Sequence, residues 1–235
     1  MIKYSTLILL VLISFQGLAS KIFIPMDDSQ ANHLKAYGVT FWVLGNGVEA
    51  HWLLNYKGGS FMFPNINDIA EQCVIRGVSF QIIADVQAAQ ILNEIGDSEA
   101  NMESVKLETP PRVAVYSPAG KLPWDDAVTL VLTYAEIPYD IVYDEEVLSG
   151  VLPKYDWLHL HHEDFTGQYG KFYKAYRTAT WYQEEVDSQN ESANFMGFQK
   201  VSEMKREVSL TLRNFVLGGG FLFTMCSGTD SFDIA

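Results

Sequence analysis

Residues 201–228, VSEMKREVSLTLRNFVLGGGFLFTMCSG, decide the fold of this chain. Within Val201–Leu217 apolar residues recur every three or four positions, which is the spacing of a helix with one buried face. Gly218–Gly220 ends that helix, because consecutive glycines do not sustain helical structure. Phe221–Cys226 is a short continuous apolar run and predicts a buried strand of a parallel sheet. A helix that leads directly into such a strand indicates an α/β fold.

Strands and helices alternate along the rest of the chain as well. Strand patterns occupy residues 21–25, 48–54, 60–63, 78–83, 112–117, 139–143 and 155–161. Helix patterns occupy residues 31–46, 66–73, 85–95 and 125–136, and residues 165–198 have the composition of a helical excursion. This alternation predicts two flavodoxin-like or Rossmann-like units, each with a parallel sheet covered on both faces.

A polar and acidic segment separates the two predicted units. It spans residues 97–111 and ends in Pro110-Pro111, and two successive prolines cannot continue a helix or lie inside a sheet. We therefore predict an N-terminal α/β domain over residues 20–96, a linker over 97–111 and a second domain over 112–235. The chain ends in a pattern typical of the first turn of a helix, so we expect the second domain to be incomplete at its C-terminus.

The N-terminus has the pattern of a secretory signal peptide over residues 1–19. Lys3 precedes the apolar stretch Leu7–Phe15, and Gly17 and Ala19 lie at the two small-residue positions before a cleavage site. The apolar stretch is shorter than the roughly 20 residues that span a bilayer. We expect a periplasmic or secreted protein with no membrane insertion after cleavage; the alternative is a buried first helix.

The composition narrows the classes of partner. The chain has 48% hydrophobic and 13% aromatic residues, which excludes a disordered protein. Its net charge of −13 opposes binding to nucleic acid and to anionic membrane surfaces. Two cysteines exclude a disulfide scaffold and a cysteine-based zinc module. The expected partner is a small molecule, either an amide or another small polar ligand.

The segment Thr224-Met225-Cys226-Ser227-Gly228 is a candidate nucleophile turn. A cysteine between a strand and a helix lies on a sharp turn, and the N-terminus of the helix favours the thiolate form. The backbone N–H of Ser227 can then stabilise an oxyanion, and Gly228 meets the need for a small residue where backbones approach closely. The alternative is a buried structural cysteine.

A second candidate group is His159-Leu160-His161-His162-Glu163-Asp164, which follows a strand that we expect to run parallel to the Cys226 strand. Both groups therefore lie at the carboxyl edge of the sheet, where open α/β sheets bind ligands. We expect the base to come from residues beyond Ala235, with His161 and His162 as the second choice, and Glu163 completes the candidate site. Alternatively, His159 is a packing residue and the remainder is a polar loop, or His159, His161 and Cys226 bind a metal. We predict a site without metal or cofactor.

Two further motifs have both a functional and a structural interpretation. Ser227–Ser231 is similar to the phosphate-binding loop of ATP-dependent amide ligases but is one residue shorter, and helix capping explains it equally well. Asn55–Gly59 is either an anion-binding loop or a plain turn between strands.

From Arg112 onward the chain resembles the class I glutamine amidotransferase-like family, whose nucleophile lies in a G-x-C-x-G motif. Cys226 and Gly228 match this motif, and Thr224 stands where the family has glycine. In that family the catalytic histidine and glutamate follow the nucleophile, at positions that would lie beyond Ala235. The chain from residue 20 also resembles the exported bacterial proteins called asparagine synthetase B. The stretches that carry this resemblance are WLLNYKGGSF, LHLHHEDFTGQYG and GGGFLFTMCSGTDSFDIA.

The resemblance implies an amide hydrolase or amidotransferase with Cys226 as nucleophile. One alternative is a ligand-binding domain that has kept the fold and lost the catalytic residues. Another is an ATP-dependent ligase of the asparagine synthetase type, which the short 227–231 loop disfavours. The expected mature N-terminus disfavours it too, since it is Ser20 and not the cysteine that this enzyme requires.

Overall fold

The computed structural model describes residues 20–97, 99, 101–118, 127–161 and 163–235. The predicted signal peptide, the start of the helix predicted over 125–136 and the candidate base His162 lie outside these residues. The chain divides into two compact units: unit 1 comprises residues 1–110 and 134–137, and unit 2 comprises 111–133 and 138–235. In the described part of the chain, no helix has both the length and the apolar composition needed to cross a membrane.

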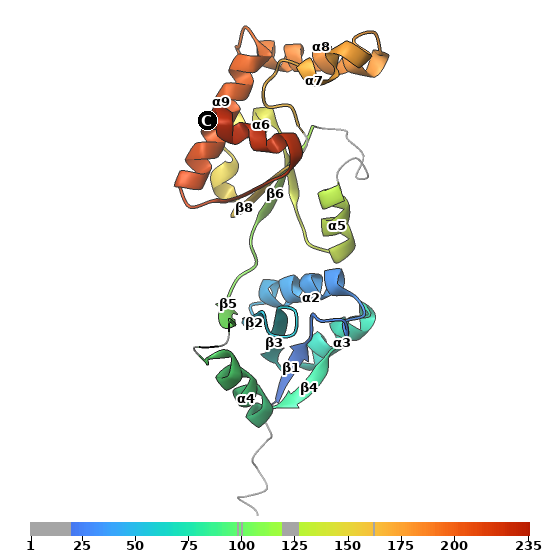
Figure 1. The fold of residues 1–235 in the computed structure, drawn as a ribbon, viewed down its shortest axis with the longest axis vertical. Helices are drawn as coiled ribbons and strands as arrows, with labels where there is room; N and C mark the ends of the chain where they lie inside the picture. Colours follow the sequence, from blue (N-terminus) through green and yellow to red (C-terminus); the bar gives the residue numbers. More distant parts are fainter. Residues whose placement is uncertain (1–19, 98, 100, 119–126, 162) are drawn as a thin grey trace, which may run out of the picture. The chain divides into compact units, whose positions relative to one another are not determined.

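Unit 1 contains an antiparallel sheet, which in the described residues has the strand order β4-β1-β3-β2-β5. Its strands are β1 (Ser20–Ile24), β2 (Ala50–Leu54), β3 (Ser60–Pro64), β4 (Gln81–Ala84) and β5 (Glu103–Leu107). Its helices are α2 (His33–Gly45), α3 (Asn67–Ile75) and α4 (Asp85–Ile95) (Figure 1).

The prediction of a parallel sheet in the first unit is therefore wrong. α2 and α3 do connect strands that run in the same direction, but an antiparallel strand lies between the members of each pair: β3 lies between β1 and β2, and β1 between β3 and β4. α4 connects the two edge strands, β4 and β5. The turn at residues 55–59, which joins β2 to β3, is too short for the crossover that parallel neighbours require.

The predicted linker also needs correction, because residues 103–107 form strand β5. This strand pairs with β2 along its whole length, with Val105 opposite Trp52. The boundary between the two units lies at Pro110–Pro111, at the end of the segment assigned to the linker. The part of that segment up to residue 107 therefore completes the first sheet.

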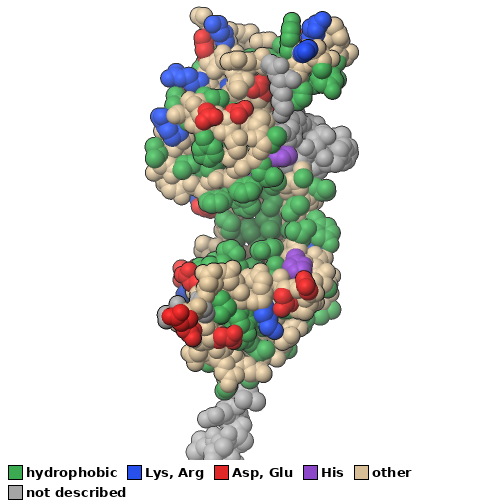
Figure 2. Space-filling view, viewed as in Figure 1, with side chains coloured by type: hydrophobic (Ala, Val, Ile, Leu, Met, Phe, Trp, Pro, Cys, Tyr) green, Lys and Arg blue, Asp and Glu red, His purple; other side chains and the backbone are tan. Residues whose placement is uncertain are grey.

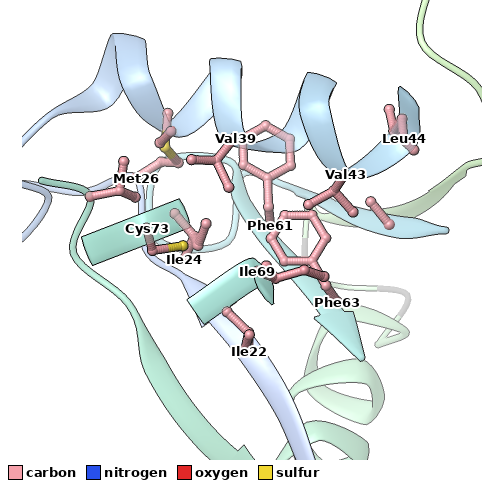
Figure 3. Packing of buried hydrophobic residues seen from close by; sticks show 13 residues of the cluster. Ile22, Ile24, Met26, Val39, Val43, Leu44, Phe61, Phe63, Ile69 and Cys73 are labelled. Carbon is pink, nitrogen blue, oxygen red and sulfur yellow. The ribbon is translucent and has the colours of Figure 1, made fainter. Parts of the chain in front are cut away.

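Alternate residues of β1 supply the cores on the two faces of the first sheet. Ile22 and Ile24 pack with residues of α2 and α3, whereas Phe23 packs with residues of α4. Figure 3 shows the first of these cores, in which Phe63 and Cys73 are fully buried. Burial raises the pKa of the Cys73 thiol to about 11, so this thiol stays protonated and unreactive in the folded protein.

Unit 2 contains a parallel sheet with the strand order β7-β6-β8-β9 in its described residues, as predicted for this half of the chain. Its strands are β6 (Val113–Tyr116), β7 (Asp140–Val142), β8 (Trp157–Leu160) and β9 (Phe221–Thr224). Its helices are α5 (Ala127–Ala135), α6 (Asp144–Leu148), η2 (Leu152–Lys154), α7 (Gly170–Tyr176), α8 (Thr180–Phe195), α9 (Val201–Leu217), η3 (Cys226–Thr229) and α10 (Asp230–Ile234).

The predicted amphipathic helix and helical excursion are both confirmed in unit 2. α9 buries Val201, Met204, Val208, Leu212 and Phe215, and α7 and α8 occupy the excursion. Figure 1 draws α6 and α9 on one side of the parallel sheet and α5 on the other.

Strand β9 differs from its prediction as a buried strand. Among the described residues it pairs on one side only, with β8, and its outer residues are open to solvent. Phe221 is 60% exposed and Phe223 is 45% exposed. A continuous apolar run thus identified the strand correctly but not its exposure.

The core in Figure 3 gives a test of unit 1. Phe63→Ala should destabilise this unit by about 3–5 kcal/mol, because it leaves a cavity among fully buried side chains. Val74→Ala, at a position that is 69% exposed on α3, is the control and should change stability by less than about 0.5 kcal/mol. Hydrogen exchange of the β1 and β3 amides in increasing urea measures both; equal effects would contradict the assigned core.

Candidate active site at the carboxyl edge of the parallel sheet

The four parallel strands of unit 2 bring their carboxyl ends to one edge of the sheet. β8 and β9 are in register there, with Leu160 opposite Thr224, and the Met225 N–H continues the ladder to the Leu160 carbonyl at 3.0 Å. His161 follows β8 directly, and Cys226 follows β9 after one intervening residue, Met225. The structure therefore brings the two predicted groups of site residues to the same edge.

Cys226 is the first residue of η3, at a strained turn just after β9. Its φ of 52° is in the left-handed region, which few residues other than glycine adopt. The residue is exposed, so the alternative of a buried structural cysteine is wrong. Strand, positive-φ cysteine and helical turn follow one another as in a nucleophile elbow, in which the strained residue lifts its side chain above the sheet.

Gly228 ties this turn to the segment after β8. Its N–H donates to the His161 carbonyl at 2.6 Å and to the Met225 carbonyl at 3.0 Å. A Cβ atom at Gly228 would lie only 2.6 Å from the His161 carbonyl oxygen, so any larger residue would force the two backbones apart. The requirement for a small residue two positions after the cysteine is confirmed.

The two described histidines of the cluster stack on one another beside β9. The ring centroids of His159 and His161 are 6.1 Å apart, and His159 lies 5.6 Å from the ring of Phe223. His159 is fully buried, in keeping with a packing role, whereas His161 is half-buried. Of the candidate bases, His161 is the one that the described structure joins to the Cys226 turn, and the joining contact is between backbones.

The two acidic residues of the cluster, Glu163 and Asp164, are directed into the protein and not towards an open site. Glu163 is 5% exposed. Burial and the charge of Asp144 raise the pKa of Tyr116 and of Tyr143, and the charge of Glu163 adds to both shifts. Asp164 accepts hydrogen bonds from the backbone N–H groups of Thr166 and Tyr169, at 2.9 and 3.1 Å. The Asp164 carboxylate therefore stabilises the segment that follows His161.

The hydroxyl groups of Thr229 and Ser231, which follow Cys226, form hydrogen bonds within the turn itself. Thr229 Oγ1 donates to the Cys226 carbonyl at 2.7 Å, and Ser231 Oγ donates to the Gly228 carbonyl at 2.8 Å. Ser227 Oγ is buried and has no hydrogen-bond partner among the described residues. Neither η3 nor α10 has a side-chain cap hydrogen bond, so the hydroxyls of Thr229 and Ser231 bind the backbone of the turn and do not cap a helix.

The sequence analysis missed a buried polar cluster at the same edge, made of Tyr116, Tyr143, Asp144 and Lys205. Lys205 Nζ lies 2.7 Å from Asp144 Oδ2, and the two side chains are 2% and 0% exposed. Nζ also donates to the hydroxyls of Tyr116 at 3.0 Å and Tyr143 at 3.2 Å. One sequence signal was available, because Lys205 falls on the apolar face of α9 together with Val208.

Burial and negative charge keep the tyrosines of this cluster protonated. Burial first, and then the charge of Asp144, raise the pKa of Tyr116 well above its usual value, and the same causes raise the pKa of Tyr143. The Tyr116 hydroxyl can therefore donate to Asp144 Oδ1, which it contacts directly. The result is a network in which the buried carboxylate of Asp144 has both an ammonium and a phenol as partners.

A cavity of about 440 Å³ lies at the opposite, amino edge of the parallel sheet. Arg112 and Asp156, on its wall, form two side-chain hydrogen bonds of 3.0 Å. The guanidinium and the backbone N–H of Arg112 lower the pKa of Asp156 to about 2. The candidate residues follow the other ends of the strands, so we place the site at the carboxyl edge, where open α/β sheets bind ligands.

The remaining predicted sites have a structural explanation. Asn55–Gly59 forms the β2–β3 turn, in which the Lys57 carbonyl accepts a hydrogen bond from the Met26 N–H at 3.0 Å. Gly58, with a φ of 80°, lies so close to the Met26 carbonyl that a Cβ would be 2.3 Å from its oxygen.

Among the side chains that the structure describes, no three His, Cys, Asp or Glu residues gather in a way that would hold a metal ion.

Comparison of the chain with models of protein families, with curated proteins and with solved structures found no match. The functional argument therefore depends on the geometry of this site.

Substitution of Gly228 tests that geometry. Gly228→Ala should lower stability by about 1–3 kcal/mol, because the new methyl group collides with the His161 carbonyl. It should also slow alkylation of Cys226 by iodoacetamide, because the turn must move. Gly45→Ala is the control, since a Cβ there meets nothing within 4 Å. An alanine at 228 that leaves both quantities at their original values would show that the turn is not constrained as described.

Proposed function

We propose that unit 2 is a glutamine amidotransferase-like domain that hydrolyses amides, or transfers their nitrogen, with Cys226 as the nucleophile. One observation carries this proposal: a cysteine with a φ of 52°, exposed between a parallel strand and a helical turn. Strain of this kind is stored at functional sites, where the backbone holds a reacting group in place. The same backbone region is also adopted by Asn55, Lys57, Glu136 and Tyr169. The support for the proposal therefore comes from the combination of this strain with an exposed thiol at the end of a parallel strand.

The chemistry needs three groups around the substrate carbonyl. The Cys226 thiolate attacks the carbonyl carbon of the amide, and the Ser227 N–H donates to the oxyanion that forms. Collapse of this intermediate breaks the C–N bond, the nitrogen leaves as ammonia after accepting a proton, and a thioester remains. Water then hydrolyses the thioester and regenerates the thiol. His161 is the candidate proton carrier on the described chain.

The architecture of unit 2 supports this proposal. In chain order its strands lie 2-1-3-4 across the sheet, the beginning of the flavodoxin-like order. In such sheets the ligand lies at the carboxyl ends of the strands, next to the point where the strand order reverses. His161 follows β8, one of the two strands that flank this point. The resemblance of residues 112–235 to the amidotransferase-like family adds to this argument.

The proposed substrate is a small-molecule amide or another small polar ligand, met outside the cytoplasm in the periplasm or in the medium. The signal-peptide pattern of residues 1–19 supports that location. Acidic side chains lie on both units (Figure 2), and the net charge of −13 opposes nucleic acid as a partner.

A ligand-binding domain without catalysis is the second candidate. The observation in its favour is that Glu163 is buried and Asp164 is bonded within its own segment, where the amidotransferase-like family has a glycine-rich loop with a second oxyanion donor. The ATP-dependent ligase has less support, because Thr229 and Ser231 direct their hydroxyls to backbone carbonyls.

Release of ammonia from a panel of amides, with glutamine, asparagine and simple amino-acid amides, separates the two candidates. An amide hydrolase should lose about 10³-fold or more of its activity in Cys226→Ala, because the nucleophile is gone. Cys73→Ala, which changes the other cysteine, should keep its activity at temperatures where the protein is folded. Ammonia release that survives in Cys226→Ala would refute the nucleophile, and a panel without any turnover would favour the binding domain.

A further inference from the structure

Lys205 is a buried ammonium with a complete set of partners. It is 1% exposed, and its three N–H groups match three acceptors: Asp144 Oδ2, the Tyr116 hydroxyl and the Tyr143 hydroxyl. The ammonium also lies 4.5 Å from the ring centroid of Tyr143 and 5.9 Å from that of Phe165. The ion pair at the centre of the cluster, Lys205 with Asp144, is removed from solvent.

The cluster is joined to the segment that follows β8. Phe165, which is 1% exposed, stacks on the ring of Tyr116 with 5.0 Å between centroids and 28° between ring planes. Tyr116 in turn accepts from Lys205 and donates to Asp144. The position of Phe165 therefore depends on a tyrosine whose hydroxyl is held by the ion pair.

A second contact fixes the same segment to the helix that carries Lys205. Gly167, with a φ of 61°, lies against the start of α9, so that a Cβ at this position would be 2.7 Å from the Ser202 nitrogen. Asp164 closes the segment between these contacts by accepting from the N–H groups of Thr166 and Tyr169. The segment 163–169 thus packs against two neighbours: Gly167 against the start of α9, and Phe165 against Tyr116 of the Lys205 cluster.

The other end of this segment reaches the candidate nucleophile, since the His161 carbonyl accepts from Gly228. Contacts lead from Lys205 through Tyr116 to Phe165. Phe165 follows His161 by four positions in the chain, and the His161 carbonyl contacts the Cys226 turn. Stability alone gives little reason for a buried ion pair here, because apolar side chains of similar volume often give equal or greater stability. A role in positioning explains why the pair is present.

We propose that Lys205, paired with Asp144, is a positioning residue for the active site: it fixes residues 163–169 and thereby holds His161 against the Cys226 turn. This inference rests on the proposed function in one respect only, the expected effect on the reactivity of Cys226. The effect on the segment itself is independent of any catalysis.

Lys205→Met tests the proposal, with Lys200→Met at the exposed start of α9 as the matched control. Hydrogen exchange should become about tenfold faster at the amides of Thr166, Tyr169 and Gly228, whose bonds hold the segment and the turn, and stay unchanged in β1 of unit 1. Alkylation of Cys226 by iodoacetamide should slow by about fivefold, because the turn loses its support. Lys200→Met should change neither quantity.

Lys205→Met/Asp144→Leu serves where the single variant does not fold, because it leaves no unpaired buried charge. A folded variant of either kind that keeps wild-type exchange at these three amides overturns the proposal and leaves Lys205 with a structural role only. Should Cys226 of the wild-type protein react no faster than in the unfolded chain, the proposed function fails, and the exchange measurement still decides the role of Lys205.

Discussion

The hydrogen bond from the Gly228 N–H to the His161 carbonyl is the contact on which the candidate site depends. It joins the segments that follow two neighbouring parallel strands, β8 and β9, at the edge where both strands end. The bond measures 2.6 Å and leaves no room for a side chain at residue 228. Because Cys226 lies two residues earlier, this contact keeps the backbone in the turn that gives the cysteine its positive φ.

A buried ion pair, Lys205 with Asp144, lies in the interior of unit 2 near the same carboxyl edge of the sheet. A lysine and an aspartate are removed from water together, and two tyrosines satisfy the remaining hydrogen bonds of the pair. In a medium of low dielectric constant these bonds are strong, and loss of any one partner leaves an unpaired charge or donor. Such a cluster has one stable arrangement, and the residues that pack on it share that rigidity.

The sequence predicts unit 2 better than unit 1, for a physical reason. Apolar periodicity identifies α9, and the glycines after it locate β9, because these patterns depend on local structure. Pairing between strands depends on contacts far apart in sequence, so helix–strand alternation in residues 20–96 did not reveal that β3 separates β1 from β2. The short 55–59 turn was the available indication. At the site, the motif located Cys226 and Gly228, but the role of Lys205 required the fold to bring Asp144 and Tyr116 to it.

The rate at which Cys226 reacts with iodoacetamide in the folded protein tests the central claim most directly. The measurement compares the rate constant at about pH 6.5 in the folded chain with that in the urea-unfolded chain, and uses Cys73 as an internal reference. A nucleophile held at the start of a helical turn should react about tenfold faster when folded, while Cys73, buried in unit 1, should react only after unfolding. Equal or slower alkylation of Cys226 in the folded protein would contradict its assignment as the nucleophile.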